Sequence, residues 1–319
     1  MKKIVVLDAG TLGDDLSLLP LEAEGEVTVY QTSPPETVRE RITGADAVIL
    51  NKVKIGEAQL PEEGAPAGSP GIICVAATGF DNIDLDACRR HGVAVANVRG
   101  YSSESVMQVT VGLVLSLITH LPTYCRATAD GSYTAGGNAN MLVPAYREIS
   151  GLTWGVVGAG KIGSRVADVA RALGCRVLTN RRTPDGVSVD LDTLLRESDI
   201  ITVHTPLTPE TRGLIGEREL SLMKDGVILV NMARGAVTDE AAVAAAVASG
   251  KLGALGCDVY SVEPFPESHP YYSIRDRENV LLTPHMSWGA YEARARCLDE
   301  MILNMRAFFA GDKRNRVDC

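Results

Sequence analysis

Short runs of apolar, often β-branched residues recur along the first third of the chain, separated by polar stretches. They lie at residues 3–7, 27–31, 47–51, 71–77 and 93–98. Runs this short and this uniformly apolar are typical of strands buried on both faces, as in a parallel sheet covered by helices. The first third is therefore predicted to form a parallel α/β domain.

A different pattern occupies residues 102–131, where apolar residues recur at a helical spacing. Ser102, Ser103 and Glu104 offer the hydroxyl and carboxylate groups that favour a helix N-terminus. Apolar side chains then follow at Met107, Leu113, Leu117 and Leu121. The pattern predicts one long helix that links two domains.

After Gly151 a second series of short apolar runs alternates with helical stretches. The runs lie at residues 153–157, 176–179, 200–204, 227–231, 253–259 and 280–283. This alternation predicts a six-stranded, doubly wound parallel sheet. An amphipathic segment at residues 291–309 follows the last run and has no strand of its own to cover. We expect it to return to the first domain, which would then be discontinuous in sequence.

Length and composition agree with two ordinary globular domains. The chain has 319 residues, of which 45% are hydrophobic and 22% are charged, and this length exceeds what one core usually accommodates. The longest apolar run, residues 109–118, is about half as long as a membrane span. The first three residues lead directly into a predicted strand and do not resemble a signal peptide. We therefore expect a soluble, cytoplasmic protein.

The charge and the cysteine content narrow the class of partner. A formal net charge of −9 would repel nucleic-acid phosphates and acidic membrane surfaces, so neither partner is expected. The seven cysteines form no CxxC pair and no His-Cys spacing, so the sequence indicates neither a disulfide framework nor a metal site. An anionic substrate would have to be held by a few placed cations.

A glycine-rich turn stands between the first strand and the first helix of the second series. Gly158, Gly160 and Gly163 form a GxGxxG motif, with Lys161 and Ile162 between the last two glycines. Such glycines allow a tight turn, close approach of backbone N–H groups to a pyrophosphate, and close helix–sheet packing. The motif predicts a dinucleotide site. The simpler alternative is that the glycines serve packing alone.

The residues after the next strand bear on which dinucleotide is bound. A site for NAD usually has an acidic residue there, about 20 residues after the turn, to bind the ribose hydroxyls. This chain has Asn180, Arg181 and Arg182 instead. Paired guanidinium groups would attract a 2′-phosphate, so NADP(H) is favoured and NAD(H) is the alternative. The other interpretation is that both arginines are solvated turn residues.

Three polar groups follow strands of the second series, at the edge where ligands bind in open α/β sheets. Arg234 follows the run at 227–231, Glu263 follows the run at 253–259, and His285 follows the last run. Arg234 could grip a carboxylate and a carbonyl through its planar guanidinium. His285 could donate or accept a proton, with Glu263 as its carboxylate neighbour. Together the three groups suit the reduction of a carbonyl.

Each of these residues also has a structural interpretation when it is taken alone. Arg234 could be a surface ion-pair residue, Glu263 a solvated loop carboxylate, and His285 a strand-end residue. His204 also ends a strand, and could be structural or lie near the nicotinamide. The remaining histidines lie in turns or loops: His91, His120 and His269. The hypothesis of a catalytic site therefore rests on the combination.

Several separated motifs carry a resemblance to a known family. They are Asn51-Lys52, residues 76–84, residues 100–106, the turn at Gly158, His204-Thr205-Pro206, residues 231–235, Asp258 with Glu263-Pro264, and Thr283-Pro284-His285. On these motifs, which cover nearly the whole length, the chain resembles the D-isomer-specific 2-hydroxyacid dehydrogenase family. Within it, the chain is most similar to the branch of glycerate dehydrogenases, hydroxypyruvate reductases and glyoxylate reductases.

The resemblance implies two doubly wound parallel-sheet α/β domains with a cleft between them. A flavodoxin-like substrate-binding domain would occupy residues 1–99, completed by residues 287–319. A Rossmann dinucleotide-binding domain would occupy residues 100–286. The family also suggests a homodimer built on the nucleotide domain.

The resemblance also implies roles for individual residues. Arg234, Glu263 and His285 would form a catalytic triad, and Thr78 and Gly79 would offer backbone N–H groups to the substrate carboxylate. The matched motifs further assign Asn51, Lys52 and Trp288 to the substrate, and Thr205, Pro206, Ala233 and Asp258 to the cofactor.

Two residues depart from the family pattern. Arg181 replaces the Asp of NAD-using members, and Val109 stands where the family usually has a histidine.

The expected function is NAD(P)-dependent oxidoreduction at C2 of a small 2-keto or 2-hydroxy acid. Hydroxypyruvate and glyoxylate are the favoured substrates, because nothing in the sequence supplies a clear second phosphate site. One alternative is a D-3-phosphoglycerate dehydrogenase. The other is a non-catalytic, nucleotide-sensing co-regulator with the same fold.

Overall fold

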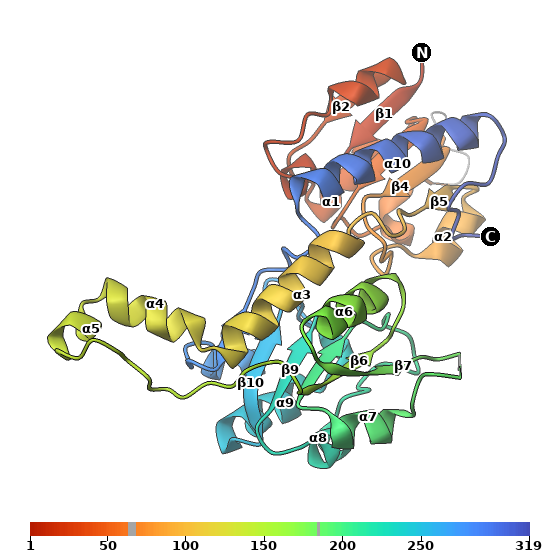
Figure 1. Cartoon of the computed structure of the whole chain (residues 1–319). Helices are drawn as coiled ribbons and strands as arrows, with labels where there is room; N and C mark the ends of the chain where they lie inside the picture. Colours follow the sequence, from red (N-terminus) through yellow and green to blue (C-terminus); the bar gives the residue numbers. More distant parts are fainter. Residues whose placement is uncertain (63–67, 184–185) are drawn as a thin grey trace. The chain divides into compact units, whose positions relative to one another are not determined.

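The chain folds into two parallel α/β units (Figure 1). The computed structural model describes residues 1–62, 68–183 and 186–319. Unit 1 comprises Met1–Ser102 and Gly289–Cys319, and unit 2 comprises Ser103–Trp288. Unit 1 thus ends its first segment at Ser102 instead of residue 99, and resumes at Gly289 instead of residue 287. The predicted class, two parallel-sheet α/β domains, is confirmed.

Unit 1 is built on a five-stranded parallel sheet with the order β2-β1-β3-β4-β5. The strands are β1 (Lys3–Val6), β2 (Glu26–Val29), β3 (Ala47–Leu50), β4 (Ile72–Val75) and β5 (Ala94–Ala96). This is the flavodoxin-like order. Every residue of β3, β4 and β5 is buried. Burial on both faces explains why these runs are continuously apolar.

Helices cover the sheet of unit 1. Helices α1 (Pro35–Ile42) and α2 (Leu85–Arg90) pack on one face through a cluster that includes Ile42, Cys88 and Ile73. Helix α10 (Tyr291–Phe309) packs on β4 and runs across the strands in Figure 1. The Asn304 amide of α10 donates to the Asn97 carbonyl at 3.0 Å. The closing helix therefore belongs to the first unit. Short 3-10 turns complete the unit: η1 (Ala9–Thr11), η2 (Leu19–Ala23) and η3 (Glu57–Gln59).

Unit 2 contains six parallel strands in the order β11-β10-β9-β8-β6-β7. They are β6 (Thr153–Val157), β7 (Arg176–Asn180), β8 (Ile200–Val203), β9 (Val227–Asn231), β10 (Leu252–Cys257) and β11 (Val280–Leu282). The chain runs from β6 outward to β7 and then returns to place β8 on the other side of β6. Ligands of open α/β sheets bind at such a reversal, beyond the carboxyl ends of the strands.

Both faces of the unit 2 sheet are covered. Val227 and Leu229 of β9 join the cluster that includes residues of α7 (Leu191–Glu197), α8 (Glu217–Leu222) and α9 (Glu240–Ser249). Ile228 and Val230 join the cluster with α3 (Ser103–Ile118) and α6 (Lys161–Ala172). Neighbouring residues of one strand thus enter opposite cores, as the two-residue period of a strand requires. The 3-10 turns η4 (Gly235–Val237) and η5 (Pro270–Ser273) follow β9 and β10.

The helix predicted across residues 102–131 is interrupted, so that prediction was wrong. Helix α3 ends at Ile118, and α4 (Leu121–Ala129) follows after a bend of 68°. His120 adopts a left-handed conformation with φ of 51°. Pro122 lies in the first turn of α4, where a proline loses no helical hydrogen bond. In a continuous helix the Pro122 ring would clash with a carbonyl of the preceding turn.

The apolar side chains of α3 lie inside unit 2. Val106, Leu113, Val114 and Leu117 are all buried there. In the described part of the chain, no single helix is long and apolar enough to cross a membrane. Only α3 and α4 taken together, as a bent pair, meet such a criterion by length and composition.

Candidate active site

The glycine turn joins β6 to α6 at the strand reversal of unit 2. Gly158 has a φ of +88°, which side chains rarely tolerate. A Cβ atom at Gly158 would also lie 2.6 Å from the Thr205 nitrogen and 2.9 Å from the His204 carbonyl carbon. The turn after β6 and the loop after β8 are therefore in direct contact, and only glycine fits between them.

The other two glycines of the motif have different surroundings. A Cβ atom at Gly163 would overlap the Gly158 carbonyl oxygen, so Gly163 permits the close packing of α6. A Cβ atom at Gly160 would have no described atom within 4 Å. Gly160 is exposed and directly precedes α6. The space beside Gly160 is thus open to a phosphate group approaching the N-terminus of α6.

His204 lies at the same reversal, directly after β8. Both of its ring nitrogens are buried and have no hydrogen-bond partner among the described residues. Burial lowers the pKa of His204 to about 3, so the ring is neutral near pH 7. A neutral imidazole carries one donor and one acceptor that need partners. These orphaned nitrogens and the open space at Gly160 fit a bound dinucleotide.

The end of β7 supplies the residues expected to contact the ribose. The Asn180 carbonyl accepts hydrogen bonds from the N–H groups of Gly158 and Ala159, both at 3.1 Å. Arg181 and Arg182 are exposed. The Arg181 Nη2 atom donates to the Ser164 hydroxyl at 3.2 Å, which places the Arg181 guanidinium beside the first turn of α6. Arg181 is therefore next to the glycine turn.

Other residues assigned to the cofactor surround this turn. Lys161 and Ile162 begin α6, Thr205 and Pro206 follow His204, and Ala233 is buried beside Arg234. All of them lie beyond the carboxyl ends of strands β6, β8 and β9, in unit 2.

His285 and Glu263 form a hydrogen-bonded pair after the last two strands of the unit. The His285 Nδ1 atom lies 2.7 Å from Glu263 Oε2. The other carboxylate oxygen, Oε1, accepts the Tyr260 N–H at 3.0 Å. The side chains of His285 and Glu263 are 20% and 29% exposed, so the pair is reachable by a small molecule. With Nδ1 engaged by Glu263, Nε2 is the nitrogen suited to exchange a proton with a substrate.

Arg234 follows β9 and is half-buried. The Asn231 amide donates to the Arg234 carbonyl at 3.0 Å, and its oxygen accepts the Ala233 N–H at 3.0 Å. Asn231 therefore fixes the loop that carries Arg234. A Cβ atom at Gly235 would overlap the backbone of Tyr260, so this loop directly contacts the loop that carries Glu263. The structure thus gathers Arg234, Glu263 and His285 at one edge of one sheet.

Asp258 holds the loop that carries His285. It is completely buried. Its Oδ1 accepts the Thr283 hydroxyl at 2.6 Å and the Met286 N–H at 2.9 Å, and its Oδ2 accepts the Ser287 N–H at 3.0 Å. Each bond to a charged acceptor contributes roughly 1.5–3 kcal/mol. Together they outweigh the cost of about 1–2 kcal/mol for the left-handed φ of 52° at His285.

Trp288 contacts the same loop. Its indole N–H donates to the His285 carbonyl at 3.0 Å, and its ring packs against the buried cluster of α3 and α6. The resemblance assigned Asp258 to the cofactor and Trp288 to the substrate. The hydrogen bonds described here add a second role to each residue, because both hold His285 in place.

In unit 1, Asp8 organises the loop after β3. Asp8 is 4% exposed. Its Oδ1 accepts the Asn51 N–H at 2.8 Å, and its Oδ2 accepts those of Lys52 and Val53 at 2.6 and 3.0 Å. No sequence motif pointed to Asp8. Its position directly after an apolar run was the available signal, because polar residues at strand ends are where sites form.

The other predicted substrate residues of unit 1 follow β4. The Thr78 hydroxyl donates to the Val98 carbonyl at 2.8 Å, and the Asn97 amide donates to the Thr78 carbonyl at 2.7 Å. The peptide that joins Thr78 to Gly79 is thereby fixed on one side. Thr78 and Lys52 are exposed.

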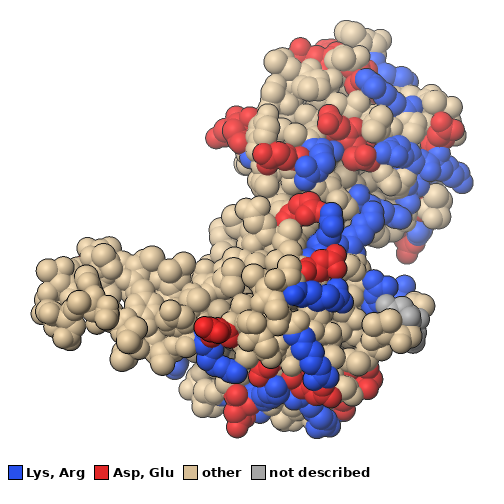
Figure 2. Space-filling model, in the orientation of Figure 1, with Lys and Arg blue, Asp and Glu red and all other residues tan. Residues whose placement is uncertain are grey.

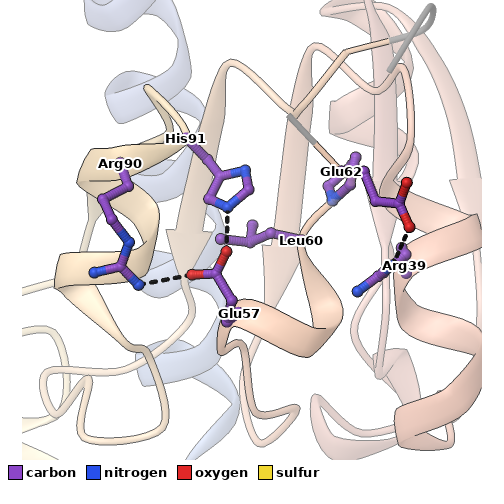
Figure 3. Close-up of a pocket in the computed structure, with 7 residues that line it drawn as sticks. Arg39, Glu57, Leu60, Glu62, Arg90 and His91 are labelled. Atoms are coloured by element: carbon purple, nitrogen blue, oxygen red, sulfur yellow. Dashed lines mark hydrogen bonds and ion pairs between the residues drawn. The ribbon is translucent and has the colours of Figure 1, made fainter. Parts of the chain in front are cut away.

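A cavity of about 270 Å³ in unit 1 is separate from these residues (Figure 3). Its lining comprises Arg39, Glu57, Leu60, Pro61, Glu62, Arg90 and His91. Glu57 lies between His91 and Arg90, at 2.7 and 2.6 Å from their nitrogens, and these hydrogen bonds lower the pKa of Glu57. The Arg39–Glu62 pair at 3.5 Å lies across the cavity. The charged groups of this lining therefore pair with each other.

Comparison with known proteins decides the family. The family model described as "D-isomer specific 2-hydroxyacid dehydrogenase, NAD binding domain" matches residues 111–287. A glycerate dehydrogenase from Methylorubrum extorquens is 35% identical over 99% of this chain and 99% of its own length. This chain belongs to the D-isomer-specific 2-hydroxyacid dehydrogenase family. The resemblance inferred from the motifs is confirmed.

Two further comparisons agree. A hydroxypyruvate reductase from Blautia hydrogenotrophica is 34% identical over 99% of this chain and 99% of its own length. The solved structure of a D-lactate dehydrogenase from Aquifex aeolicus, complexed with NAD and lactic acid, has a TM-score of 0.84 and 28% identity, and covers 100% of this chain and 99% of that chain. The protein is therefore a nicotinamide-dependent 2-hydroxyacid oxidoreductase, as the sequence indicated.

Gly160 and Gly163 form a matched pair for testing the dinucleotide turn of this dehydrogenase. Gly163→Ala should cost roughly 1–3 kcal/mol of stability, because its Cβ would overlap the Gly158 carbonyl oxygen. Gly160→Ala should cost roughly 0.5–1 kcal/mol, because Gly160 is the N-cap of α6 and alanine is a poorer N-cap residue than glycine, but it should weaken dinucleotide binding at least about tenfold. The measurements are thermal unfolding and fluorescence titration with the dinucleotide. Unchanged affinity in Gly160→Ala would mean that the phosphates do not approach this glycine.

Proposed function

We propose that this dehydrogenase reduces hydroxypyruvate and glyoxylate, with Arg234, Glu263 and His285 as its catalytic residues. The observation that carries the proposal is the 2.7 Å pair of His285 with Glu263, at the sheet edge that also holds Arg234 and the glycine turn. Whole-length similarity to a glycerate dehydrogenase and a hydroxypyruvate reductase supports this choice of substrates.

The chemistry follows from the charges of these side chains. The nicotinamide, when bound, supplies the hydride for C2 of the keto acid and takes it up in the reverse reaction. Protonated His285, paired with Glu263, donates its Nε2 proton to the oxygen that becomes negative. Arg234 binds the carboxylate and the carbonyl through its guanidinium, and stabilises the developing alkoxide. Glu263 stabilises the imidazolium, so His285 carries the proton when the substrate oxygen becomes negative.

We assign the substrate carboxylate to residues of unit 1 as well. In this proposal Thr78 and Gly79 donate backbone N–H groups, and Asn51 and Lys52 contribute polar contacts. The fixed Thr78 carbonyl and hydroxyl support a preorganised donor peptide. The Asp8 carboxylate similarly supports the loop that carries Asn51 and Lys52. Trp288 is the aromatic side chain expected near the substrate.

His285→Gln tests the proposal. The wild type should oxidise NADPH or NADH in the presence of hydroxypyruvate and glyoxylate, with lower kcat/KM for pyruvate and 3-phosphohydroxypyruvate. His285→Gln should lower kcat by about 10²-fold to 10⁴-fold, the usual contribution of a positioned acid–base group. Dinucleotide affinity and thermal stability should be nearly unchanged.

The matched control is His120→Gln, a histidine that follows α3 in the same unit. Its kcat should equal that of the wild type. A wild type without turnover on any of the four keto acids would overturn the proposed activity. Normal kcat in His285→Gln would remove His285 from the reaction while leaving the activity assigned.

We also propose that NADP(H) is preferred over NAD(H). Arg181 lies beside the first turn of α6 through its bond to Ser164. No carboxylate stands among residues 180–182 to repel a phosphate. A hydrogen bond with Thr208 is the main reason that the pKa of Glu210 is lowered, and the charge of Arg182 adds a smaller contribution. Glu210 is thus a carboxylate near Arg182 and partly offsets the positive field of Arg182. Arg181 is therefore the principal phosphate ligand in this proposal.

Arg181→Asp should reverse the cofactor preference. One charged hydrogen bond contributes about 1.5–3 kcal/mol, so the wild type should prefer NADPH by roughly tenfold to a hundredfold, less any screening of an exposed site. The measurement is kcat/KM for both cofactors at one ionic strength. Arg171→Asp, in the last turn of α6, controls for the change in net charge. Equal or NADH-favouring values in the wild type would make Arg181 a solvated turn residue.

We propose that the protein is a homodimer in which residues 119–149, here called the arm, form the interface. The arm contains α4 and α5 (Ser132–Ala135) and extends from the sheet of unit 2 (Figure 1). Leu142 and Val143 are 72% and 74% exposed. Other large apolar side chains of the arm are also exposed: Leu121, Tyr133, Met141 and Tyr146. Figure 2 shows a broad uncharged face over this segment. Such concentrations of apolar surface mark interaction sites.

Charges placed in the arm should dissociate the dimer. We expect the double variant Leu142→Glu, Val143→Glu to sediment as a monomer where the wild type sediments as a dimer, because buried unpaired carboxylates are costly. Leu19→Glu, at another exposed leucine, should leave the dimer intact. A monomeric wild type, or an arm variant that still dimerises, would contradict this interface.

A further inference from the structure

Tyr260 touches all three of the loops that carry the catalytic side chains. Its N–H donates to Glu263 Oε1 at 3.0 Å. Its hydroxyl donates to the Thr283 carbonyl at 2.9 Å, two residues before His285. Its backbone packs so closely on Gly235, next to Arg234, that no side chain would fit there. No sequence motif pointed to Tyr260.

The Thr283 carbonyl oxygen links the Tyr260 hydroxyl to the backbone of His285. The same carbonyl oxygen accepts the His285 N–H at 3.0 Å. His285 has the unfavourable left-handed φ of 52°, which persists only where surrounding contacts determine it. Asp258 holds the loop from one side, and the Tyr260 hydroxyl holds it at Thr283.

Tyr260 is itself held rigidly. It is 9% exposed, and its ring centroid lies 4.6 Å from that of Phe265 and 6.0 Å from that of His269. Burial raises the pKa of Tyr260 above its ordinary value, so the hydroxyl keeps the proton that it donates. The Tyr260 side chain thus joins the loop that carries Glu263 to the loop that carries His285, with its hydroxyl in a fixed position.

A buried hydrogen bond between Glu240 and His269 anchors the backbone beside Tyr260. Glu240 and His269 are 8% and 7% exposed, and Glu240 Oε2 lies 2.9 Å from His269 Nε2. The Tyr271 N–H donates to His269 Nδ1 at 3.2 Å, so Nε2 carries the proton that faces Glu240. Glu240 Oε1 also accepts the Ser261 N–H at 2.9 Å. The peptide that joins Tyr260 to Ser261 is therefore fixed to α9 by this hydrogen bond.

We propose that Tyr260 is a positioning residue of this dehydrogenase: its hydroxyl, acting through the Thr283 carbonyl, sets how closely His285 approaches Glu263. Its N–H orients the same Glu263 carboxylate. This inference rests on the proposed role of His285 as the acid–base group. Among the described residues, the charged and titratable groups that face Tyr260 include Glu263, Asp258, Glu240, His269, Tyr271 and Cys257.

Tyr260→Phe isolates the hydroxyl. The phenylalanine keeps the ring packing and the N–H to Glu263, and loses the hydroxyl with its 2.9 Å bond to the Thr283 carbonyl and its longer 3.4 Å contact with the Cys257 carbonyl. We expect kcat for keto-acid reduction to fall about fivefold to thirtyfold, with dinucleotide affinity unchanged. Tyr272→Phe removes a hydroxyl bonded to Glu267 in the same segment and should change neither quantity.

A double-mutant cycle separates positioning from general support of the fold. In the His285→Gln background, Tyr260→Phe should cause no further loss of kcat, because its effect passes through His285. The same loss in both backgrounds would overturn the inference. A Tyr260→Phe enzyme with the kcat of Tyr272→Phe would overturn it as well.

A measurement without turnover keeps this inference separate from the proposed activity. The chain has five histidines, and the imidazole signals of His285 can be identified in ¹⁵N NMR spectra by their loss in His285→Gln. At one pH, the His285 ¹⁵N chemical shifts should differ from the wild-type values in Tyr260→Phe and match them in Tyr272→Phe, because the Tyr260 hydroxyl acts on the contact of His285 Nδ1 with Glu263. A wild type inactive on every keto acid would overturn the proposed function alone. Identical His285 chemical shifts in the two variants would overturn the positioning role, whatever the wild type catalyses.

Discussion

The hydrogen bonds to the buried carboxylate of Asp258 are the interaction on which the pairing of His285 with Glu263 depends. An ionised carboxylate without partners in a protein core is prohibitively costly, so the loop after β11 must supply hydrogen bonds, and it does so through Thr283, Met286 and Ser287. Satisfying that charge fixes the loop in the one conformation that puts His285 at 2.7 Å from Glu263. The left-handed backbone of His285 is the smaller cost of that arrangement.

The same solution appears in unit 1, where the Asp8 carboxylate accepts the N–H groups of Asn51, Lys52 and Val53. In both units a parallel sheet brings the carboxyl ends of its strands to one edge, and the loops that leave this edge have backbone N–H groups outside the strand ladder. A buried acidic side chain on a neighbouring strand satisfies them. Loops that could otherwise move are thereby held as rigid supports for polar side chains.

Charge is distributed in the protein so that a few cations act against an acidic background. The net charge is −9, yet Arg234 stands at the sheet edge with His285, and Arg181 stands beside the first turn of α6. In the proposed function, an anionic substrate or phosphate binds where these cations and the helix N-terminus lie. The neutral, buried ring of His204 adds polar atoms at the strand reversal without adding charge.

The sequence by itself determined the parallel α/β class, the glycine turn and the three strand-end residues Arg234, Glu263 and His285, because these depend on local patterns: apolar runs, glycine spacing, and polar residues directly after a strand. Pro122 was also a local signal for the break at His120, although a single continuous helix was predicted there. Only the tertiary structure decided that Asp258 holds the His285 loop, that Asp8 holds the loop at Asn51, and that the Tyr260 hydroxyl reaches Thr283. Those hydrogen bonds join segments that are far apart in the chain. Their partners depend on how the strands pack and on which groups can bond to buried charges, and no local sequence pattern specifies either.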